Sequence, residues 1–293
     1  MEPTGGHDWI KACALPDHTE LQERTLKTDL DIVIGDRCQI DYGLAGKDVV
    51  VCEFSKINGD IVAAGDIRVD NWCEIGGDVI AEEDAYLGEG VKIQGKLIVK
   101  GDLDIGDNVQ IERGFEAKGW ISIRNPMPVI VYIMMYLVAI LGIEREDELD
   151  AVLEELFGGE EEEEGEEGEE RKPPATPPLM IPAGAVLNMQ TFSVPGKMAV
   201  GAGCRLHGNI RARSIAVQEE TTIFGSLHVQ EEATIARRSV IHGDLQGEGD
   251  VTIAQEVHIL GNVSCKDLTL HEDARVDGVI RAPGGMKITR REA

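Results

Sequence analysis

Hydrophobic residues return at a nearly constant interval in the second half of the chain. They accompany five evenly spaced glycines, Gly208, Gly225, Gly243, Gly261 and Gly278. Aliphatic residues lie two positions before and two positions after them, at Leu206, Ile223, Ile241, Ile259 and Val276 and at Ile210, Leu227, Leu245, Val263 and Ile280. A repeat of about 18 residues is typical of stacked coils and not of a single helix or hairpin.

Two further apolar columns keep the same interval. They are Met198, Ile215, Ala233, Val251, Leu268 and Met286, and Val200, Val217, Ile235, Ile253, Leu270 and Ile288. Residues between the columns, such as Ala216 and Thr252, should point to solvent because side chains alternate along a strand. The pattern predicts an all-β domain over residues 185–290, a three-sided parallel β-helix. We expect its glycines at corners, where the backbone adopts conformations that a Cβ opposes.

The first part of the chain contains a similar array, over residues 32–124. Its columns keep a constant spacing and include Ile57, Ile75, Ile93 and Ile111, then Ile61, Val79, Leu97 and Phe115, and then Val69, Leu87, Ile105 and Ile123. We therefore predict a second parallel β-helix domain. The fold class is all-β, with two such solenoid domains.

The remaining segments divide the chain further. Residues 1–31 are polar and are expected to form an N-terminal arm, with a short capping helix around Asp17 to Leu26. Residues 125–157 combine an apolar segment with an amphipathic acidic helix. Residues 158–184 are rich in Glu and Pro and should form a disordered linker, because they cannot bury a core. Two folded domains joined by a flexible connection are expected.

Residues 126–143 contain no charged side chain. A helix of this length is at the lower limit for crossing a bilayer. Three interpretations remain open: a cap on the first β-helix, a helix lying on a membrane surface, and a membrane span. Membrane association is favoured, through Val129, Ile130, Val131, Ile133, Met134, Leu137, Val138, Ile140 and Leu141. The protein is then expected in the cytoplasm, at the inner face of the cell membrane.

The net charge of −26 is concentrated in one place, since residues 144–170 hold 16 acidic residues and one basic residue. No basic stripe is present, so nucleic-acid binding is not expected. The 6 cysteines show no CxxC pair. Cys73 and Cys204 lie in apolar columns and are interpreted as small core residues. We predict no metal and no cofactor.

The repeated unit of apolar residue, any residue, Gly, any residue and apolar residue, as in residues 206–210 and 241–245, resembles the bactofilins. These are polymer-forming cytoskeletal proteins with a parallel β-helix core. The resemblance covers residues 185–290 well and residues 32–124 more loosely. It implies a structural scaffold that shapes the cell, with copies of itself as partners, together with the membrane surface and other scaffold or cell-envelope proteins.

A rival interpretation is a hexapeptide-repeat acyltransferase, whose left-handed β-helix also uses about 18 residues per coil. Such an enzyme generally requires a histidine base in a cleft. The first array has no histidine between Ile32 and Arg124, and the second has His207, His228, His242, His258 and His271 without an inserted loop. We therefore expect no enzymatic activity and no catalytic residues.

Two surfaces are expected to mediate polymerisation. The first consists of the ends of the second array, represented by Met198 and Val200 and by Ile280 and Ile288, because an end coil leaves its apolar side chains and strand edges uncovered. The second is an outward column in which Phe224 and Leu260 alternate with His207 and His242. These two histidines lie two coils apart, about 9.6 Å, which is too far to share a metal ion.

Overall fold

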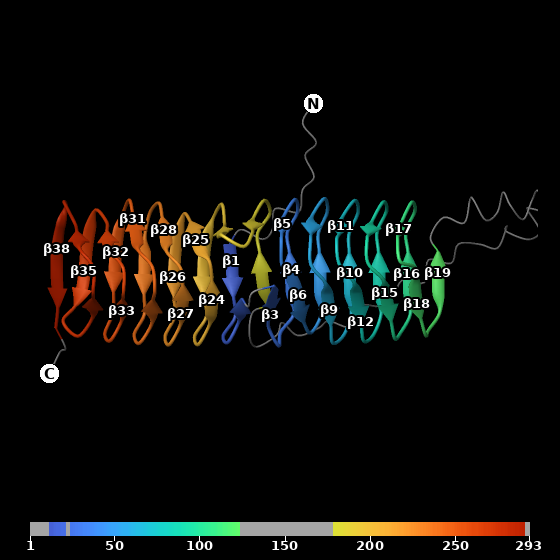
Figure 1. Ribbon diagram of the computed structural model, residues 1–293, viewed down its shortest axis with the longest axis horizontal. Coiled ribbons are helices and arrows are strands. Elements are labelled where there is room, and N and C mark those ends of the chain that lie inside the picture. Colours follow the sequence, from blue (N-terminus) through green and yellow to red (C-terminus); the bar gives the residue numbers. More distant parts are fainter. Residues whose placement is uncertain (1–11, 22–23, 124–177, 291–293) are drawn as a thin grey trace, which may run out of the picture. The chain divides into compact units, whose positions relative to one another are not determined.

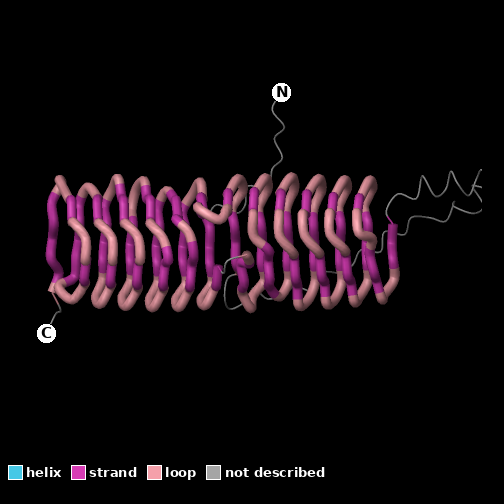
Figure 2. The backbone as a smooth tube through the Cα atoms, in the orientation of Figure 1, coloured by secondary structure: helices cyan, strands magenta, loops and turns pink. Residues whose placement is uncertain are grey.

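The computed structural model describes residues 12–21, 24–123 and 178–290. In these residues the regular secondary structure consists of short strands joined by tight turns (Figure 2). The strands form three long sheets, which we name A, B and C, with 14, 12 and 12 strands. These residues thus form a three-sided parallel β-solenoid of about 12 turns. The periodicity predicted the all-β class and the three-sided parallel coil.

The strands of each sheet follow one another in space from the first array to the second. Sheet A comprises β19 (Ile121–Ile123), β16 (Leu103–Ile105), β13 (Ala85–Leu87), β10 (Ile67–Val69), β7 (Val49–Val51), β4 (Ile32–Ile34), β20 (Leu179–Ile181), β1 (Ala12–Leu15), β23 (Lys197–Val200), β26 (Ser214–Val217), β29 (Ala233–Ile235), β32 (Asp250–Ile253), β35 (Asp267–His271) and β38 (Gly285–Thr289). Sheet B comprises β18 (Phe115–Ala117), β15 (Leu97–Val99), β12 (Val79–Ala81), β9 (Ile61–Ala63), β6 (Gly43–Gly46), β3 (Thr25–Lys27), β2 (Glu20–Leu21), β24 (Arg205–His207), β27 (Thr222–Phe224), β30 (Val240–Ile241), β33 (His258–Ile259) and β36 (Arg275–Val276). Sheet C comprises β17 (Gln110–Ile111), β14 (Lys92–Ile93), β11 (Glu74–Ile75), β8 (Lys56–Ile57), β5 (Gln39–Ile40), β21 (Val186–Leu187), β22 (Thr191–Ser193), β25 (Asn209–Ala212), β28 (Leu227–Val229), β31 (Leu245–Gly247), β34 (Val263–Ser264) and β37 (Ile280–Arg281).

The apolar columns predicted from the sequence are rows of directly paired residues. Leu206 pairs with Ile223, and the row continues to Val276 in sheet B. In sheet C, Ile57 pairs with Ile75, and that row continues to Ile111. Away from the ends these side chains are fully buried. The register of both arrays is therefore confirmed, and their columns form the core.

Both arrays belong to one compact unit and share all three sheets. This differs from the expectation of two domains on a flexible connection. The sheet order shows that the arrays run in opposite directions from the middle: the first proceeds from β4 to β19, and the second from β23 to β38. In Figure 1 the N-terminal strand β1 lies among the strands of the second array.

The middle of the solenoid is built by strand exchange. Strands β1 and β2 pair parallel with β23 and β24 of the second array, whereas β20 and β21 pair parallel with β4 and β5 of the first. Antiparallel pairs join the two sides, β1 with β20, β2 with β3 and β21 with β22. We call these three pairs the head junction. Residues 17–26 thus contain β2 and the start of β3 in place of the expected capping helix and loose arm.

The two sides of the head junction make matching hydrogen bonds. The thiol of Cys38 donates to the carbonyl oxygen of Pro182 at 3.2 Å, and Cys204 donates to Pro16 at 3.2 Å. In the same way the hydroxyl of Ser55 donates to Gly35 at 2.8 Å, and that of Thr221 donates to Gly201 at 2.8 Å. Cys38 thus corresponds to Cys204 and Ser55 to Thr221, at one constant offset in sequence. These reciprocal contacts indicate an internal two-fold relation between the halves.

The glycine column has a different cause from the one we expected. Among the described glycines of this column only Gly208 has a positive φ, 102°. At Gly225 an added Cβ would lie 2.1 Å from the carbonyl oxygen of Gly208 in the preceding coil. Left-handed backbone is instead found at residues such as Trp72 and Glu220. The column therefore reflects close approach between coils.

Candidate functional site

One end of the solenoid, which we call the β19 end, consists of β17, β18 and β19. Each is the last strand in its sheet. Ile121 and Ile123 are 47% and 53% exposed, although Leu87, in the same column as Ile123, is only 3% exposed. Phe115 is 44% exposed for the same reason. Within residues 12–21, 24–123 and 178–290, no further coil covers the core residues of this end.

The opposite end, the β38 end, consists of β36, β37 and β38. Met286 and Ile288 are 51% and 55% exposed, whereas Ile253, in the same column as Ile288, is 1% exposed. Ile280 is partly buried, and the residue paired with it in the preceding coil, Val263, is fully buried. Ile288 is thus exposed at this end as expected, whereas Ile280 is only partly exposed.

Met198 and Val200, expected at the other open end of the second array, are in a different situation. They are 2% and 0% exposed because β1 covers them, with Cys13 opposite Met198 and Leu15 opposite Val200. The start of the second array therefore lies inside the head junction. Sequence periodicity missed this because the covering strand comes from a distant part of the chain.

The outward column on sheet B forms a ring stack. Phe224 lies between His207 and His242, with ring centroids 4.5 and 4.6 Å apart and interplanar angles of 15° and 23°. Phe224 is partly covered by this stacking, and Leu260 remains 39% exposed. The two histidines are thus separated by an aromatic ring, which is consistent with stacking between coils and not with a shared metal ion.

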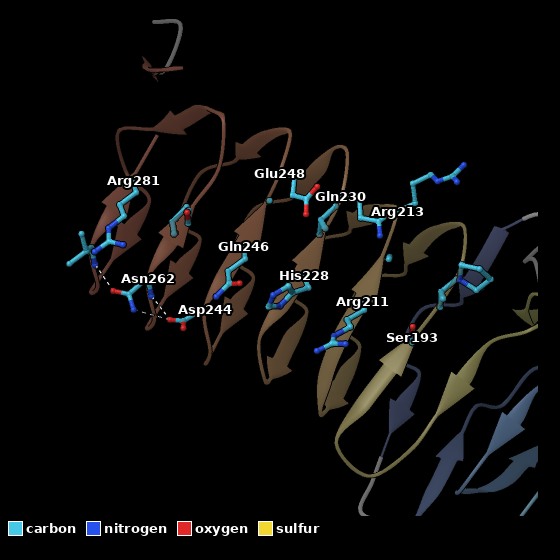
Figure 3. A pocket seen from close by; sticks show the side chains of 18 residues that line it. Ser193, Arg211, Arg213, His228, Gln230, Asp244, Gln246, Glu248, Asn262 and Arg281 are labelled. Atoms are coloured by element: carbon cyan, nitrogen blue, oxygen red, sulfur yellow. Dashed lines mark hydrogen bonds between the residues drawn. The ribbon is translucent and has the colours of Figure 1, made fainter. Parts of the chain in front are cut away.

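A groove of about 1010 Å³ follows the outer face of sheet C in the second array (Figure 3). Its floor is one row of paired outward residues, Arg211, His228, Gln246, Ser264 and Arg281. Figure 3 shows Arg213, Gln230 and Glu248 along one side of this row, and Asp244 and Asn262 along the other. The groove offers hydrogen-bonding groups of mixed charge. Sequence reasoning did not identify it, because its residues come from separate coils.

The corresponding face of the first array has different chemistry. By the correspondence that matches Cys38 with Cys204, Val62 matches His228. Val62 is 39% exposed and is paired with Ile80, which in turn pairs with Ile98, all on the outer face of sheet B. Corresponding strands of the two halves thus carry an apolar outward row in the first half and a polar outward row in the second.

The cysteines are buried, as predicted for Cys73 and Cys204. Burial raises the pKa of the Cys73 thiol to about 12 and the pKa of Cys204 to about 11. The pKa values of Cys38 and Cys52 are raised to about 11 by the same cause. Thiols with such pKa values remain protonated at neutral pH and are poor nucleophiles and metal ligands.

In the described part of the chain, some charged side chains near histidines form small ion pairs. His258 Nε2 lies 2.8 Å from Asp277 Oδ2, and the Nε of Arg275 donates to the other oxygen of Asp277 at 2.7 Å. These contacts lower the pKa of Asp277. Within residues 12–21, 24–123 and 178–290, no three metal-ligating side chains come together.

The apolar segment 126–143, with its candidate membrane residues Val129 to Leu141, lies outside the described residues. Among the residues that the structure describes, none forms a helix long and apolar enough to cross a bilayer. Comparison with known proteins gives no match to a protein-family model, to a curated protein or to a solved structure.

Proposed function

We propose that this chain is a structural protein that polymerises end to end through its terminal coils, as a cytoskeletal scaffold of the bactofilin type. The observation that carries the proposal is the exposure of core residues at both ends. Ile123 and Ile288 are more than half exposed, whereas residues of the same columns inside the solenoid are almost completely buried. Copies of the chain are the partners that would restore this burial.

The physical driving force has two parts. Full burial of an aliphatic side chain contributes roughly 1.5–3 kcal/mol, and each end offers several such side chains. The terminal strands β19 and β38 also present backbone N–H and C=O groups along an open edge, which readily pairs with another strand. A second solenoid placed on the end satisfies both requirements at once.

Resemblance to the bactofilins supports the same function through the glycine-centred repeat of residues 206–280. The proposal includes neither catalysis nor a cofactor. The alternative, an acyltransferase, would need a general base beside a substrate pocket. His228 lies in the floor of the groove and is the candidate base for that alternative, whereas His207 and His242 are stacked on Phe224. We favour assembly because core residues are exposed at both ends of the solenoid, and a neighbouring copy would bury them.

Membrane association belongs to the proposal through residues 126–143, which are uncharged. Because acidic residues follow immediately, adhesion to anionic headgroups must come from apolar burial and should resist high salt. We place the assembled protein in the cytoplasm at the inner membrane face, with cell-envelope or other scaffold proteins as further partners. Flotation with liposomes in high salt, compared with a chain lacking residues 126–143, tests this part.

Substitution at the β38 end tests the polymer itself. The double variant Ile280→Asp with Ile288→Asp buries charge at any joint made by this end, which is strongly unfavourable. We expect short soluble species by sedimentation, whereas the wild-type chain forms large assemblies. Val62→Asp is the matched control, since it places a carboxylate on an exposed aliphatic residue far from the ends. Assemblies of unchanged size from the double variant would exclude end-to-end polymerisation through β38.

A further inference from the structure

We propose that the two ends of this solenoid are complementary, so that the β19 end of one copy joins the β38 end of the next. This inference rests on the proposed function, because it specifies which surfaces meet in the polymer. The alternative is that like ends meet, β19 with β19 and β38 with β38. The two arrangements place different side chains opposite each other.

Outward residues form axial rows that run the whole length of each sheet. One row on sheet B starts at Glu116 and ends at Arg275. At the head junction this same row passes through Lys27 and Glu20, which are directly opposite each other in an antiparallel pair. The row therefore already contains one oppositely charged pair where the two halves meet.

A copy added by continuing the solenoid along its axis repeats this pairing. It places Arg275 of one copy next to Glu116 of the other on sheet B, because both belong to the same row. Sheet C brings Gln110 and Arg281 together in the same way, since they are the last outward residues of its row at the two ends. Opposite charges across neighbouring strands, as in the pair of Arg275 and Glu116, stabilise the pairing.

Like ends would meet by a two-fold rotation, which sets a sheet B strand of one copy against a sheet C strand of the other. At the β38 end this brings Arg275 opposite Arg281, twice in each joint. Like charges directly opposite each other on neighbouring strands are destabilising. At the β19 end the rotation brings Glu116 opposite Gln110, with no charge attraction.

Existing contacts at the ends are compatible with an added pair. Glu116 bonds to Lys96 within its own copy, and Arg275 bonds to Asp277. Glu116 is 67% exposed and Arg275 is 71% exposed, so both retain accessible surface. Within the described residues Arg281 and Lys287 have no ion-pair partner, so both contribute positive charge to the β38 end.

Blocking one end at a time distinguishes the two arrangements. One full-length variant carries Ile121→Asp and Ile123→Asp at the β19 end, and the other carries Ile280→Asp and Ile288→Asp at the β38 end. If unlike ends join, each variant alone stays at the single-chain mass of 31.8 kDa by light scattering. An equimolar mixture then forms dimers that grow no further, while Val62→Asp assembles as the wild type does.

Dimers formed by either blocked variant alone would overturn the inference, because they require like ends to join. A mixture that stays monomeric while the wild type assembles would also overturn it. A wild-type chain that never assembles would instead refute the proposed function, so the two failures are separable.

Charge reversal provides a test that leaves the core side chains intact. Arg275→Glu sets two carboxylates against each other at an unlike joint and should raise the critical concentration about tenfold. Adding Glu116→Arg in the same chain restores the opposite pair and should return the critical concentration toward wild type. Failure of the second substitution to rescue assembly would contradict the proposed joint.

Discussion

At the scale of single residues, the distance between consecutive coils decides where the solenoid requires glycine. At Gly225 the next coil passes so near that an added Cβ would lie 2.1 Å from the carbonyl oxygen of Gly208. At Gly184 the reason is different, because its φ is +72° and no atom lies within 4 Å of an added Cβ. Two glycines in the same fold thus answer two separate physical requirements.

Replacing glycine by alanine should therefore lower the free energy of unfolding for a different reason at each of these two positions. Gly225→Ala should lower the free energy of unfolding by about 1–3 kcal/mol, because the methyl group has to displace backbone of the preceding coil. Gly184→Ala meets no atom and should cost only the left-handed conformation, about 1–2 kcal/mol. Urea unfolding of both variants measures the difference. No measurable loss at Gly225 would contradict close approach between coils as the reason for the glycine column.

The apolar columns were predictable from the sequence because each coil repeats the same inward positions. Ile57, Ile75 and Ile93 could be aligned from their spacing alone, and their pairing in sheet C confirms the alignment. The left-handed residues were not predictable, since Trp72 and Glu220 share no side-chain property that favours a positive φ. Their positive φ is imposed by the turn between two strands of a coil, and the residue type does not indicate where that turn lies.

Among the strands, the head junction is the element that joins the two arrays. It uses antiparallel pairs, whereas every other described strand pair in the three sheets is parallel. Each side completes the other: β1 covers β23, and β20 covers β4. The sequence could not reveal this arrangement, because the middle coils combine segments that are far apart in the chain and no single segment shows a full period.

A pair of cysteines tests the junction. Ala14 and Met180 are directly opposite each other in the antiparallel pair of β1 and β20. Opposite residues in such a pair have Cα atoms about 4.5–5.5 Å apart, which suits a disulfide. We expect the variant Ala14→Cys with Met180→Cys to form an intramolecular bond on mild oxidation, detected as a mobility change in non-reducing electrophoresis.

A matched pair serves as the control. Val33 is paired with Met180 on the side away from β1, so the variant Ala14→Cys with Val33→Cys places the thiols two strands apart. This variant should not form the bond. Efficient oxidation of the control, or none in the variant with Met180→Cys, would contradict the strand exchange.

At the scale of the whole molecule, the solenoid joins its two arrays in the middle, and no other described strand covers its two outer ends. Met198 and Val200 are buried inside the junction, whereas Ile123 and Ile288 remain exposed. That solenoid ends promote assembly stays a prediction from the sequence. Which ends are exposed could not be predicted, because that depends on the strand exchange. End-to-end assembly is therefore expected to use the outer coils and not Met198 and Val200.

Electron microscopy of assemblies formed by the purified full-length chain tests end-to-end polymerisation most directly. We predict unbranched filaments whose averaged images show an axial spacing of about 4.8 Å, the distance between neighbouring strands. That spacing places the solenoid axis along the filament, and a filament of single-solenoid width then requires the copies to join end to end. Filaments with strands running along the axis, or a wild-type chain that remains at 31.8 kDa at every concentration measured, would contradict end-to-end assembly of the solenoid.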